Sequence, residues 1–164
     1  MRVLCIILML IMLSGCGPQQ MWETVDDTWI EAVAPCREII ISLPSEAVTP
    51  TLQSDEGGKL YLCNGYTLSS QILPAGDLNR TIYQITGFSL DQLTCIQTQF
   101  DYVKRYECVW SSAGEAGDHV GRAVILDDGN HHYAVSVMAD SGVAGDLTQT
   151  WQTVLGSVSL TDTD

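Results

Sequence analysis

The stretch that decides the fold is HVGRAVILD-DG-NHHYAVSVMA, from His119 to Ala139. Two runs rich in β-branched residues, 119–127 and 130–139, flank Asp128-Gly129, and this dipeptide favours a two-residue type I′ hairpin turn. Such a turn places two residues opposite one another when their numbers sum to 257. The stretch therefore predicts a long antiparallel hairpin.

Both faces of this hairpin are apolar, so we expect helices to cover each side of the sheet. The exception is Arg122, for which we expect either a bulge or a different register at that end. The first face carries Val120, Val124, Leu126, Tyr133, Val135 and Val137, and the second carries Gly121, Ala123, Ile125, Ala134, Ser136 and Met138.

Two further hairpins precede this one. Residues 59–63 and 66–68 flank Asn64-Gly65, another type I′ signal. Residues 93–100 and 103–111 flank a tight turn at Asp101-Tyr102, a register in which opposed numbers sum to 203. Cys95 then lies opposite Cys108 in a non-hydrogen-bonded pair, where the backbones are close enough for a disulfide.

Helical spacing of apolar residues predicts two helices. The first follows Asp77 as N-cap and ends at Gly87. The second follows Asp146 as N-cap and ends at Gly156, with a stripe of Leu147, Trp151, Val154 and Leu155. Strands at 38–43 and 157–160 complete the pattern, and residues 50–58 are predicted to be a loop.

These elements predict one α+β domain over residues 36–160. We expect a central twisted antiparallel sheet of about six strands with helices on both faces, followed by a flexible tail at 161–164.

The N-terminus predicts export. Met1-Arg2 leads into an apolar run from Val3 to Leu13, and about eleven apolar residues are too few to cross a ~30 Å hydrocarbon core. Residues 1–15 are therefore interpreted as a signal peptide. Leu13-Ser14-Gly15-Cys16 resembles the lipobox of bacterial lipoproteins, although an ordinary signal peptide with a chance cysteine is the alternative.

The lipoprotein resemblance implies that the chain is cut before Cys16 and that this cysteine carries diacylglycerol and palmitate. Residues 16–35 would then be a lipidated N-terminus and tether. The implied location is the extracytoplasmic face of a bacterial cell membrane, with the lipid as the anchor.

Charge excludes one class of partner. The chain has a formal charge of −13, which becomes −14 when the signal peptide takes away Arg2. A strongly acidic surface is repelled by a phosphate backbone, so we expect no nucleic-acid binding.

Cysteine usage is consistent with export. Cys5 leaves with the signal peptide and Cys16 takes the lipid, so an even four remain for two disulfides. The hairpin register favours Cys95–Cys108, and elimination then gives Cys36–Cys63. Other pairings remain open, and a four-cysteine zinc site is disfavoured because no CxxC pair is present.

Candidate chemistry is sparse. His131 and His132 adjoin Asp127 and Asp128, but adjacent strand residues point to opposite faces and cannot both bind one ion. His132, Asp127 and Asp128 remain as binding candidates. No GxSxG, SxxK or HExxH motif occurs, so we predict no catalytic residue, no metal ligand and no cofactor.

The order of elements resembles the PsbP-like superfamily, most closely in the strand 133–139, the helix that contains Trp151, and Gly156 to Leu160. This resemblance implies a central antiparallel sheet with helices on both faces, and a binding or assembly role rather than catalysis.

The sequence thus predicts a membrane-tethered extracytoplasmic lipoprotein that is a non-catalytic binding or assembly module. An envelope protein or a glycan would be its partner, and the oligomeric state stays open. The alternatives are a surface hydrolase without a recognisable motif and a metal-ion-binding surface protein.

Overall fold

The computed structural model describes residues 35–47, 49–55, 57–113 and 117–162. The predicted signal peptide, Cys16 and nearly all of the tether lie outside these residues. Within the described part of the chain, no helix is long and apolar enough to cross a membrane.

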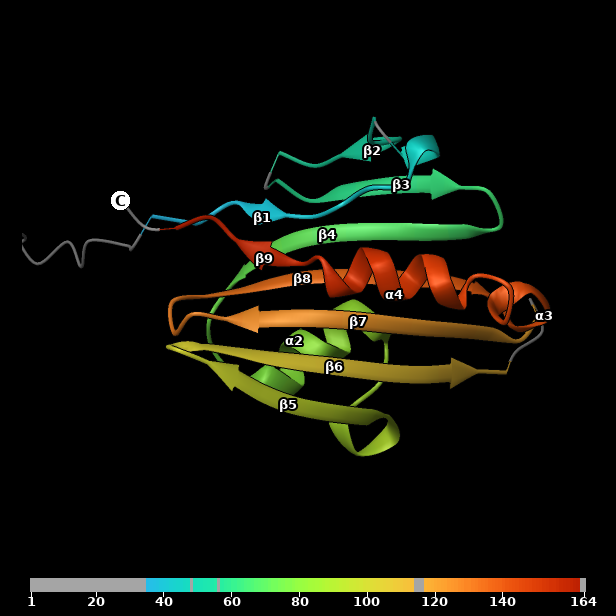
Figure 1. Ribbon diagram of the computed structural model, residues 1–164. Helices are drawn as coiled ribbons and strands as arrows, with labels where there is room; N and C mark the ends of the chain where they lie inside the picture. Colours follow the sequence, from blue (N-terminus) through green and yellow to red (C-terminus); the bar gives the residue numbers. More distant parts are fainter. Residues whose placement is uncertain (1–34, 48, 56, 114–116, 163–164) are drawn as a thin grey trace, which may run out of the picture. The chain divides into compact units, whose positions relative to one another are not determined.

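A seven-stranded antiparallel sheet forms the centre of the domain (Figure 1). A separate two-stranded sheet pairs β1 with β9. In spatial order the large sheet contains β2 (Leu52–Gln53), β3 (Lys59–Cys63), β4 (Tyr66–Pro74), β8 (His131–Asp140), β7 (His119–Asp127), β6 (Val103–Ser112) and β5 (Thr94–Phe100), and the small sheet contains β1 (Ile39–Ile40) and β9 (Ser159–Leu160).

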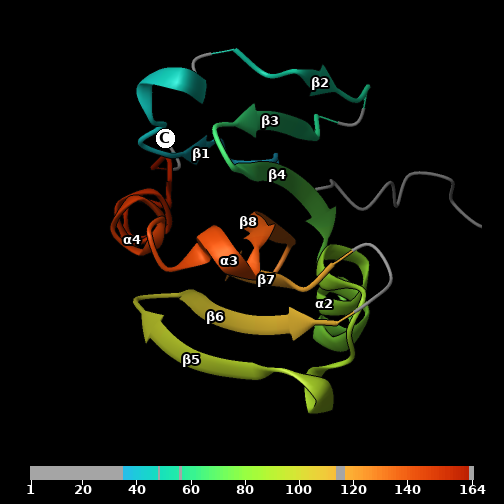
Figure 2. The same ribbon diagram turned by 90° about the vertical axis from the view of Figure 1, so that its right-hand side faces the viewer.

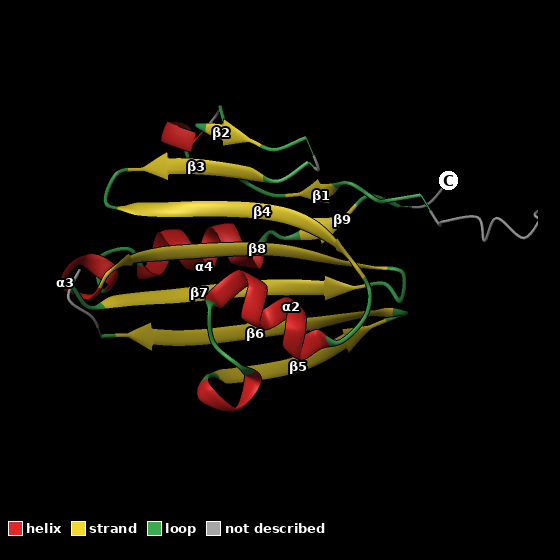
Figure 3. Cartoon of the chain, turned by 180° about the vertical axis from the view of Figure 1, so that it is seen from behind, coloured by secondary structure: helices red, strands yellow, loops and turns green. Residues whose placement is uncertain are grey.

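Helices cover both faces of the large sheet, which confirms the predicted α+β class. The helix α4 (Thr148–Gly156) lies on one face and α2 (Leu78–Thr86) on the other, as the side view in Figure 2 and the rear view in Figure 3 show. The short helix α3 (Ser141–Ala144) connects β8 to α4, and single 3₁₀ turns are formed by η1 (Ser45–Ala47) and η2 (Leu90–Gln92).

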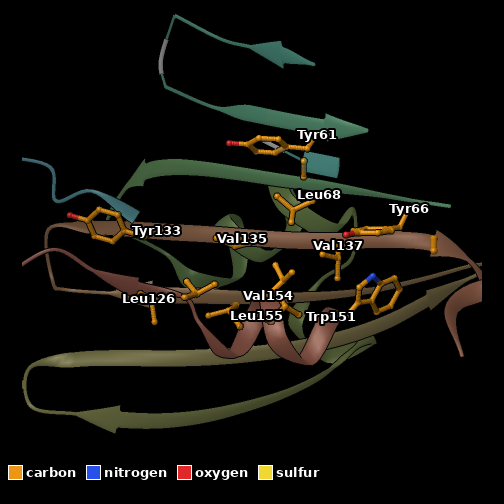
Figure 4. Close-up of a cluster of buried hydrophobic side chains, with 14 residues drawn as sticks. Tyr61, Tyr66, Leu68, Leu126, Tyr133, Val135, Val137, Trp151, Val154 and Leu155 are labelled. Carbon is orange, nitrogen blue, oxygen red and sulfur yellow. The ribbon is translucent and has the colours of Figure 1, made fainter. Parts of the chain in front are cut away.

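Each helix closes one hydrophobic core. The cluster under α4 is the larger (Figure 4), and its members include Tyr66, Leu68, Val124, Leu126, Tyr133, Val135, Val137, Trp151 and Val154. The cluster under α2 contains Ile82, Tyr106, Cys108, Ile125 and Ala134. The predicted assignment of residues to the two faces of the β7–β8 hairpin is therefore correct.

The predicted register of that hairpin is wrong by two residues. Asp127 pairs with His132, so opposed numbers sum to 259, and residues 128–130 lie between the two strands. The Asp128 carboxylate accepts hydrogen bonds from the backbone N–H groups of Asn130 and His131, and this side chain forms the turn in place of a type I′ dipeptide. Because strand side chains alternate with a period of two, a two-residue shift leaves every side chain on its predicted face.

The two other hairpins are confirmed. Asn64-Gly65 joins β3 to β4, although only Gly65 has a positive φ, of 83°, so the turn is not type I′. The β5–β6 turn at Asp101-Tyr102 gives the predicted register, in which Cys95 is paired with Cys108.

Arg122 lies in continuous strand without a bulge, and the two-residue change of register leaves it on its predicted face. The residue pairs with Val109 on one side and with Val137 on the other, without a bulge. Its guanidinium stays on the α4 face and lies over the ring of Trp151.

The predicted helix ends are right for α2 and wrong for α4. Asp77 caps α2 by accepting from the backbone N–H of Asn79, and Gly87 ends it with a φ of 78°. By contrast, α4 begins at Thr148 with Leu147 as N-cap and without a side-chain cap. The backbone N–H of Asp146 donates to the carbonyl of Val143, so Asp146 belongs to the turn after α3.

Strand lengths also differ from the prediction at the edges of the domain. Residues 38–43 contribute only the two-residue β1, whose sole partner is the equally short β9. β2 forms within the predicted loop 50–58 because it pairs with the adjacent strand β3, Leu52 with Leu60 and Gln53 with Lys59.

One glycine is required by packing. Gly121 on β7 is the cross-strand partner of Trp110 on β6. A Cβ atom at this position would lie 2.1 Å from Cζ2 of the indole. The absence of a side chain thus lets the Trp110 ring lie against the backbone of β7.

Candidate binding groove

The helix α4 covers the central strands and leaves the same face of β5 and β6 uncovered (Figures 1 and 2). Two cavities lie in this region and share Arg105 in their linings. We call them the outer lobe, of about 570 Å³, which lies between the β5–β6 turn and the β9 segment, and the inner lobe, of about 180 Å³, which lies between β6 and α4. Together we call them the α4–β6 groove.

Side chains from both walls line the groove. The outer lobe is lined by Arg37, Thr98, Gln99, Phe100, Asp101, Tyr102, Val103, Arg105, Leu126, Val158, Ser159, Leu160 and Asp162. The inner lobe is lined by Arg105, Glu107, Cys108, Val109, Arg122, Ala123, Val124, Trp151, Gln152, Leu155 and Gly156.

Arg105 holds the two walls together between the lobes. Its Nη1 and Nη2 donate to the carbonyls of Val158 and Leu155, at 3.1 and 2.8 Å, and its Nε donates to Oε1 of Glu107 at 2.7 Å. A cation at the last carbonyls of a helix also interacts favourably with the helix dipole. Since all three nitrogens are engaged, Arg105 anchors α4 to β6 and offers little to a ligand.

The rim of the outer lobe carries exposed aromatic side chains. Phe100 is 81% exposed and Tyr102 is 93% exposed. They flank Asp101, the turn residue with a φ of 53°. On the same face of the hairpin, Ile96 and Val109 are 61% and 43% exposed. Clustered exposed apolar groups of this kind mark interaction surfaces.

The inner lobe contains Arg122, which makes no ion pair among the described residues. The guanidinium carbon of Arg122 lies 5.9 Å from the centroid of the Trp151 ring. Its Nε is buried and has no hydrogen-bond partner. Buried charged groups normally have an oppositely charged partner and hydrogen bonds, and the partly buried Arg122 guanidinium lacks the charged partner.

The sequence-predicted candidate His132 lies away from this groove, on the α2 face. Its Nδ1 is 2.7 Å from Oγ1 of Thr81, and its Nε2 is 4.0 Å from Oδ2 of Asp127. Burial lowers the pKa of His132, Lys104 adds to this effect, and Asp127 and Asp128 oppose it. The arrangement is that of a buried, neutral imidazole with a structural hydrogen bond.

Asp128 is engaged on the opposite side of the sheet. Its Oδ2 accepts from the Tyr133 hydroxyl at 2.8 Å. Burial acts to raise the pKa of Asp128, but hydrogen bonds from the backbone of His131 and Asn130 and from Tyr133 outweigh it and lower this pKa. His131 itself contacts Cys36, with 3.2 Å between Nε2 and Sγ.

The two histidines thus point to opposite faces, as predicted, and His132, Asp127 and Asp128 do not converge on one site. Among the described residues, no group of three or more His, Cys, Asp or Glu side chains is arranged to hold a metal ion.

The structure brings together one of the two predicted cysteine pairs. The sulfur atoms of Cys95 and Cys108 lie 2.6 Å apart on paired strands. Cys36 and Cys63 are separated, and this prediction needs correction. Cys36 contacts the first residue of β8, whereas Cys63 pairs with Tyr66, which pairs with Ala139 near the other end of β8.

Sequence reasoning missed the groove itself. One signal was available, since Arg122 interrupts an otherwise apolar face. A second was the presence of Phe100 and Tyr102 beside a tight turn, where polar residues are usual.

The molecule thus belongs to the α+β domains in which helices cover both faces of an antiparallel sheet and a groove lies beside one helix. No protein-family model matches the chain, and no curated protein matches its sequence. Among solved structures, the domain is similar to the crystal structure of LpqN, described as involved in cell envelope biogenesis of Mycobacterium tuberculosis. The TM-score is 0.50 at 9% identity, over 77% of this chain and 85% of LpqN. At this identity the likeness concerns the fold alone, and the PsbP-like resemblance stays a prediction.

Proposed function

We propose that this chain is a membrane-tethered lipoprotein of the bacterial envelope that acts as a non-catalytic binding module, with the α4–β6 groove as its ligand site. The observation that carries the proposal is the groove, which combines an exposed aromatic rim with an unpaired arginine. Export and lipidation are inferred from Leu13-Ser14-Gly15-Cys16. The fold shared with an envelope-biogenesis protein supports the same compartment.

The dimensions of the groove favour ligand binding. Small-molecule sites are concave, mostly apolar, and commonly enclose ~300–1,000 Å³. The outer lobe, at about 570 Å³, lies in this range. Its polar side chains, Thr98, Gln99 and Ser159, can fix the orientation of a ligand.

The lining of the groove favours binding over catalysis. Acyl transfer commonly uses a serine or cysteine nucleophile beside a histidine base. The described groove lining contains no histidine, and its single thiol, Cys108, lies against Cys95. The Cys36–His131 contact, which has the composition of a nucleophile and a base, does not line either lobe.

Lipid anchoring is tested by fractionating cells that express the full chain. We expect the wild-type protein in the membrane fraction, and we expect Cys16→Ser to abolish metabolic labelling with palmitate. Equal labelling of both proteins, or wild-type protein that is found only outside the membrane fraction, contradicts the tether.

The groove is tested with two substitutions at equally exposed positions. Ile96 lies on the α4 face of β5 and pairs with Glu107 of the inner-lobe lining, and Tyr83 lies on α2. Each is 61% exposed. Lysine is the suitable replacement because Ile96 pairs with Glu107, which a new carboxylate would repel. In native gel electrophoresis of detergent-solubilised envelopes, we expect Ile96→Lys to lose the complexes that wild type and Tyr83→Lys retain. Loss in both variants, or in neither, contradicts the groove as the binding surface.

A further inference from the structure

We propose that Cys36 and His131 form a reactive thiol–imidazole pair, a modification site at which Cys36 exchanges with an accessible disulfide and becomes joined to another molecule through a mixed disulfide. The pair lines neither lobe of the α4–β6 groove. The inference rests on the export that is part of the proposed function, because disulfides persist outside the reducing cytosol.

The two side chains are in contact. Cys36 is exposed, and its Sγ lies 3.2 Å from Nε2 of His131. The thiolate, not the thiol, attacks a disulfide, and an adjacent imidazole can accept the thiol proton. The geometry therefore places a base at the sulfur that must lose its proton.

The imidazole of His131 is buried without a structural hydrogen bond. The residue is 7% exposed, and its Nδ1 has no partner. By contrast, Nδ1 of the neighbouring His132 is 2.7 Å from Oγ1 of Thr81. Among the described residues, the His131 ring has a single hydrogen-bonding contact, and this contact is with the exposed thiol of Cys36.

A carboxylate favours the protonated form of this imidazole. Asp128 accepts the backbone N–H of His131 at 2.8 Å and the Tyr133 hydroxyl at 2.8 Å. Burial acts to raise the pKa of Asp128, and these hydrogen bonds together with attraction to His131 lower it. The same attraction stabilises the imidazolium that forms when Cys36 loses its proton.

Cys36 lies far from the other described cysteines. Cys63 lies beside the Ala139 end of β8 and Cys36 beside the His131 end. Eight residues of a strand span roughly 26 Å, whereas a disulfide needs Cα atoms within about 7 Å. The remaining two described cysteines adjoin each other. An exchange at Cys36 therefore ends in a bond to another molecule.

The exchange needs a disulfide and no further reactant. His131 takes the Cys36 proton, the thiolate attacks one sulfur of the disulfide, and a new S–S bond forms as the old one breaks. The leaving thiolate takes up the proton, so one thiol is consumed and one is released. Acyl transfer is disfavoured because it needs a cavity for the acyl group, and Cys36 lines neither lobe of the groove.

The test follows the reaction of the full chain, purified in detergent, with dithiodipyridine. This disulfide is neutral, so the acidic protein does not repel it. Peptide mass mapping at successive times gives the rate at each cysteine. Cys63 is the matched internal control, because it is half-buried and burial is the largest cause that raises the pKa of its thiol.

We use about pH 6, where an ordinary thiol is almost wholly protonated. We expect Cys36 to react faster than Cys63 in the folded chain, and at least about 5-fold faster in the folded chain than in urea. Unfolding exposes Cys36 fully and separates it from His131, so exposure alone predicts the opposite order. His131→Gln should remove the advantage of the folded state, and the comparison with urea decides the matter if this variant does not fold.

Two rates would overturn the proposal. They are a reaction at Cys36 that is equally fast or slower in the folded chain than in urea, and a faster reaction at Cys63 than at Cys36 in the folded chain. Neither rate depends on the tether or on the groove, so this test fails separately from those of the proposed function.

A second arm uses cells that express the full chain, treated with a maleimide before and after reduction. We expect Cys36 to be labelled only after reduction, and the mass of the released adduct distinguishes a small thiol from a protein. Labelling of Cys36 before reduction would contradict modification in the cell.

Discussion

The guanidinium carbon of Arg122 lies 5.9 Å from the centroid of the Trp151 ring, while Nε of the same arginine is buried without a partner. A cation–π contact at a partly exposed site contributes about 0.5–1 kcal/mol, and an unsatisfied buried donor costs about 1–3 kcal/mol. The balance disfavours a purely structural role for Arg122.

Arg122→Met is therefore expected to raise the free energy of unfolding by about 1 kcal/mol, because it keeps the apolar stem and removes the uncompensated charge. Arg80→Met, at an exposed position on α2, should change it by less than about 0.5 kcal/mol. Urea unfolding followed by circular dichroism measures both. If Arg122→Met instead lowers the free energy of unfolding by more than 1 kcal/mol, the arginine stabilises the fold.

Gly121→Ala is expected to destabilise the domain by about 1–3 kcal/mol, since the new Cβ would lie 2.1 Å from the Trp110 indole. Gly142→Ala is the control, because no atom lies within 4 Å of a Cβ built there. Thermal unfolding of both variants checks the comparison. Equal melting temperatures for the two would mean that Trp110 can move away at no cost.

Oxidised protein is expected to contain a Cys95–Cys108 disulfide, because the two sulfurs lie 2.6 Å apart across paired strands. Cys36 and Cys63 should not be joined to each other. Peptide mass mapping under non-reducing conditions identifies the links, and a Cys63–Cys108 peptide would be inconsistent with the β5–β6 register.

Stability is expected to fall in mild acid because of His132. The pKa of this imidazole is lowered from the ordinary value of 6.5, and burial is the largest cause. The unfolded chain then binds the proton more readily than the folded one, so the contribution is complete above pH 6.5 and declines as the pH falls toward the folded pKa. His132→Gln should make the free energy of unfolding, measured by urea titration, less dependent on pH between pH 6.5 and 5. An unchanged slope would mean that His132 titrates alike in both states.

Local signals in the sequence were sufficient for much of the fold. Asn64-Gly65, the cap at Asp77 and the alternation through β7 and β8 each act over a few residues, and each predicted its element. The register of β7–β8 was missed because hydrogen bonds to the Asp128 side chain stabilise a different turn from residues that also suit a type I′ turn.

The groove was beyond local reasoning for a different reason. It exists because α4 covers β7 and β8 and leaves β5 and β6 open. The position of α4 on the sheet depends on contacts between residues far apart in the chain, such as those of Arg105 with Leu155 and Val158. The sequence held one trace of it, the charge of Arg122 on an apolar face.

The most direct test of the groove is photo-crosslinking in living cells with p-benzoylphenylalanine at Ile96 or at Tyr83, positions of equal exposure. We predict a crosslinked adduct from position 96 that Arg122→Gln weakens, and none from position 83. An adduct from position 83 alone, or from both positions in equal yield, would contradict a ligand site between α4 and β6.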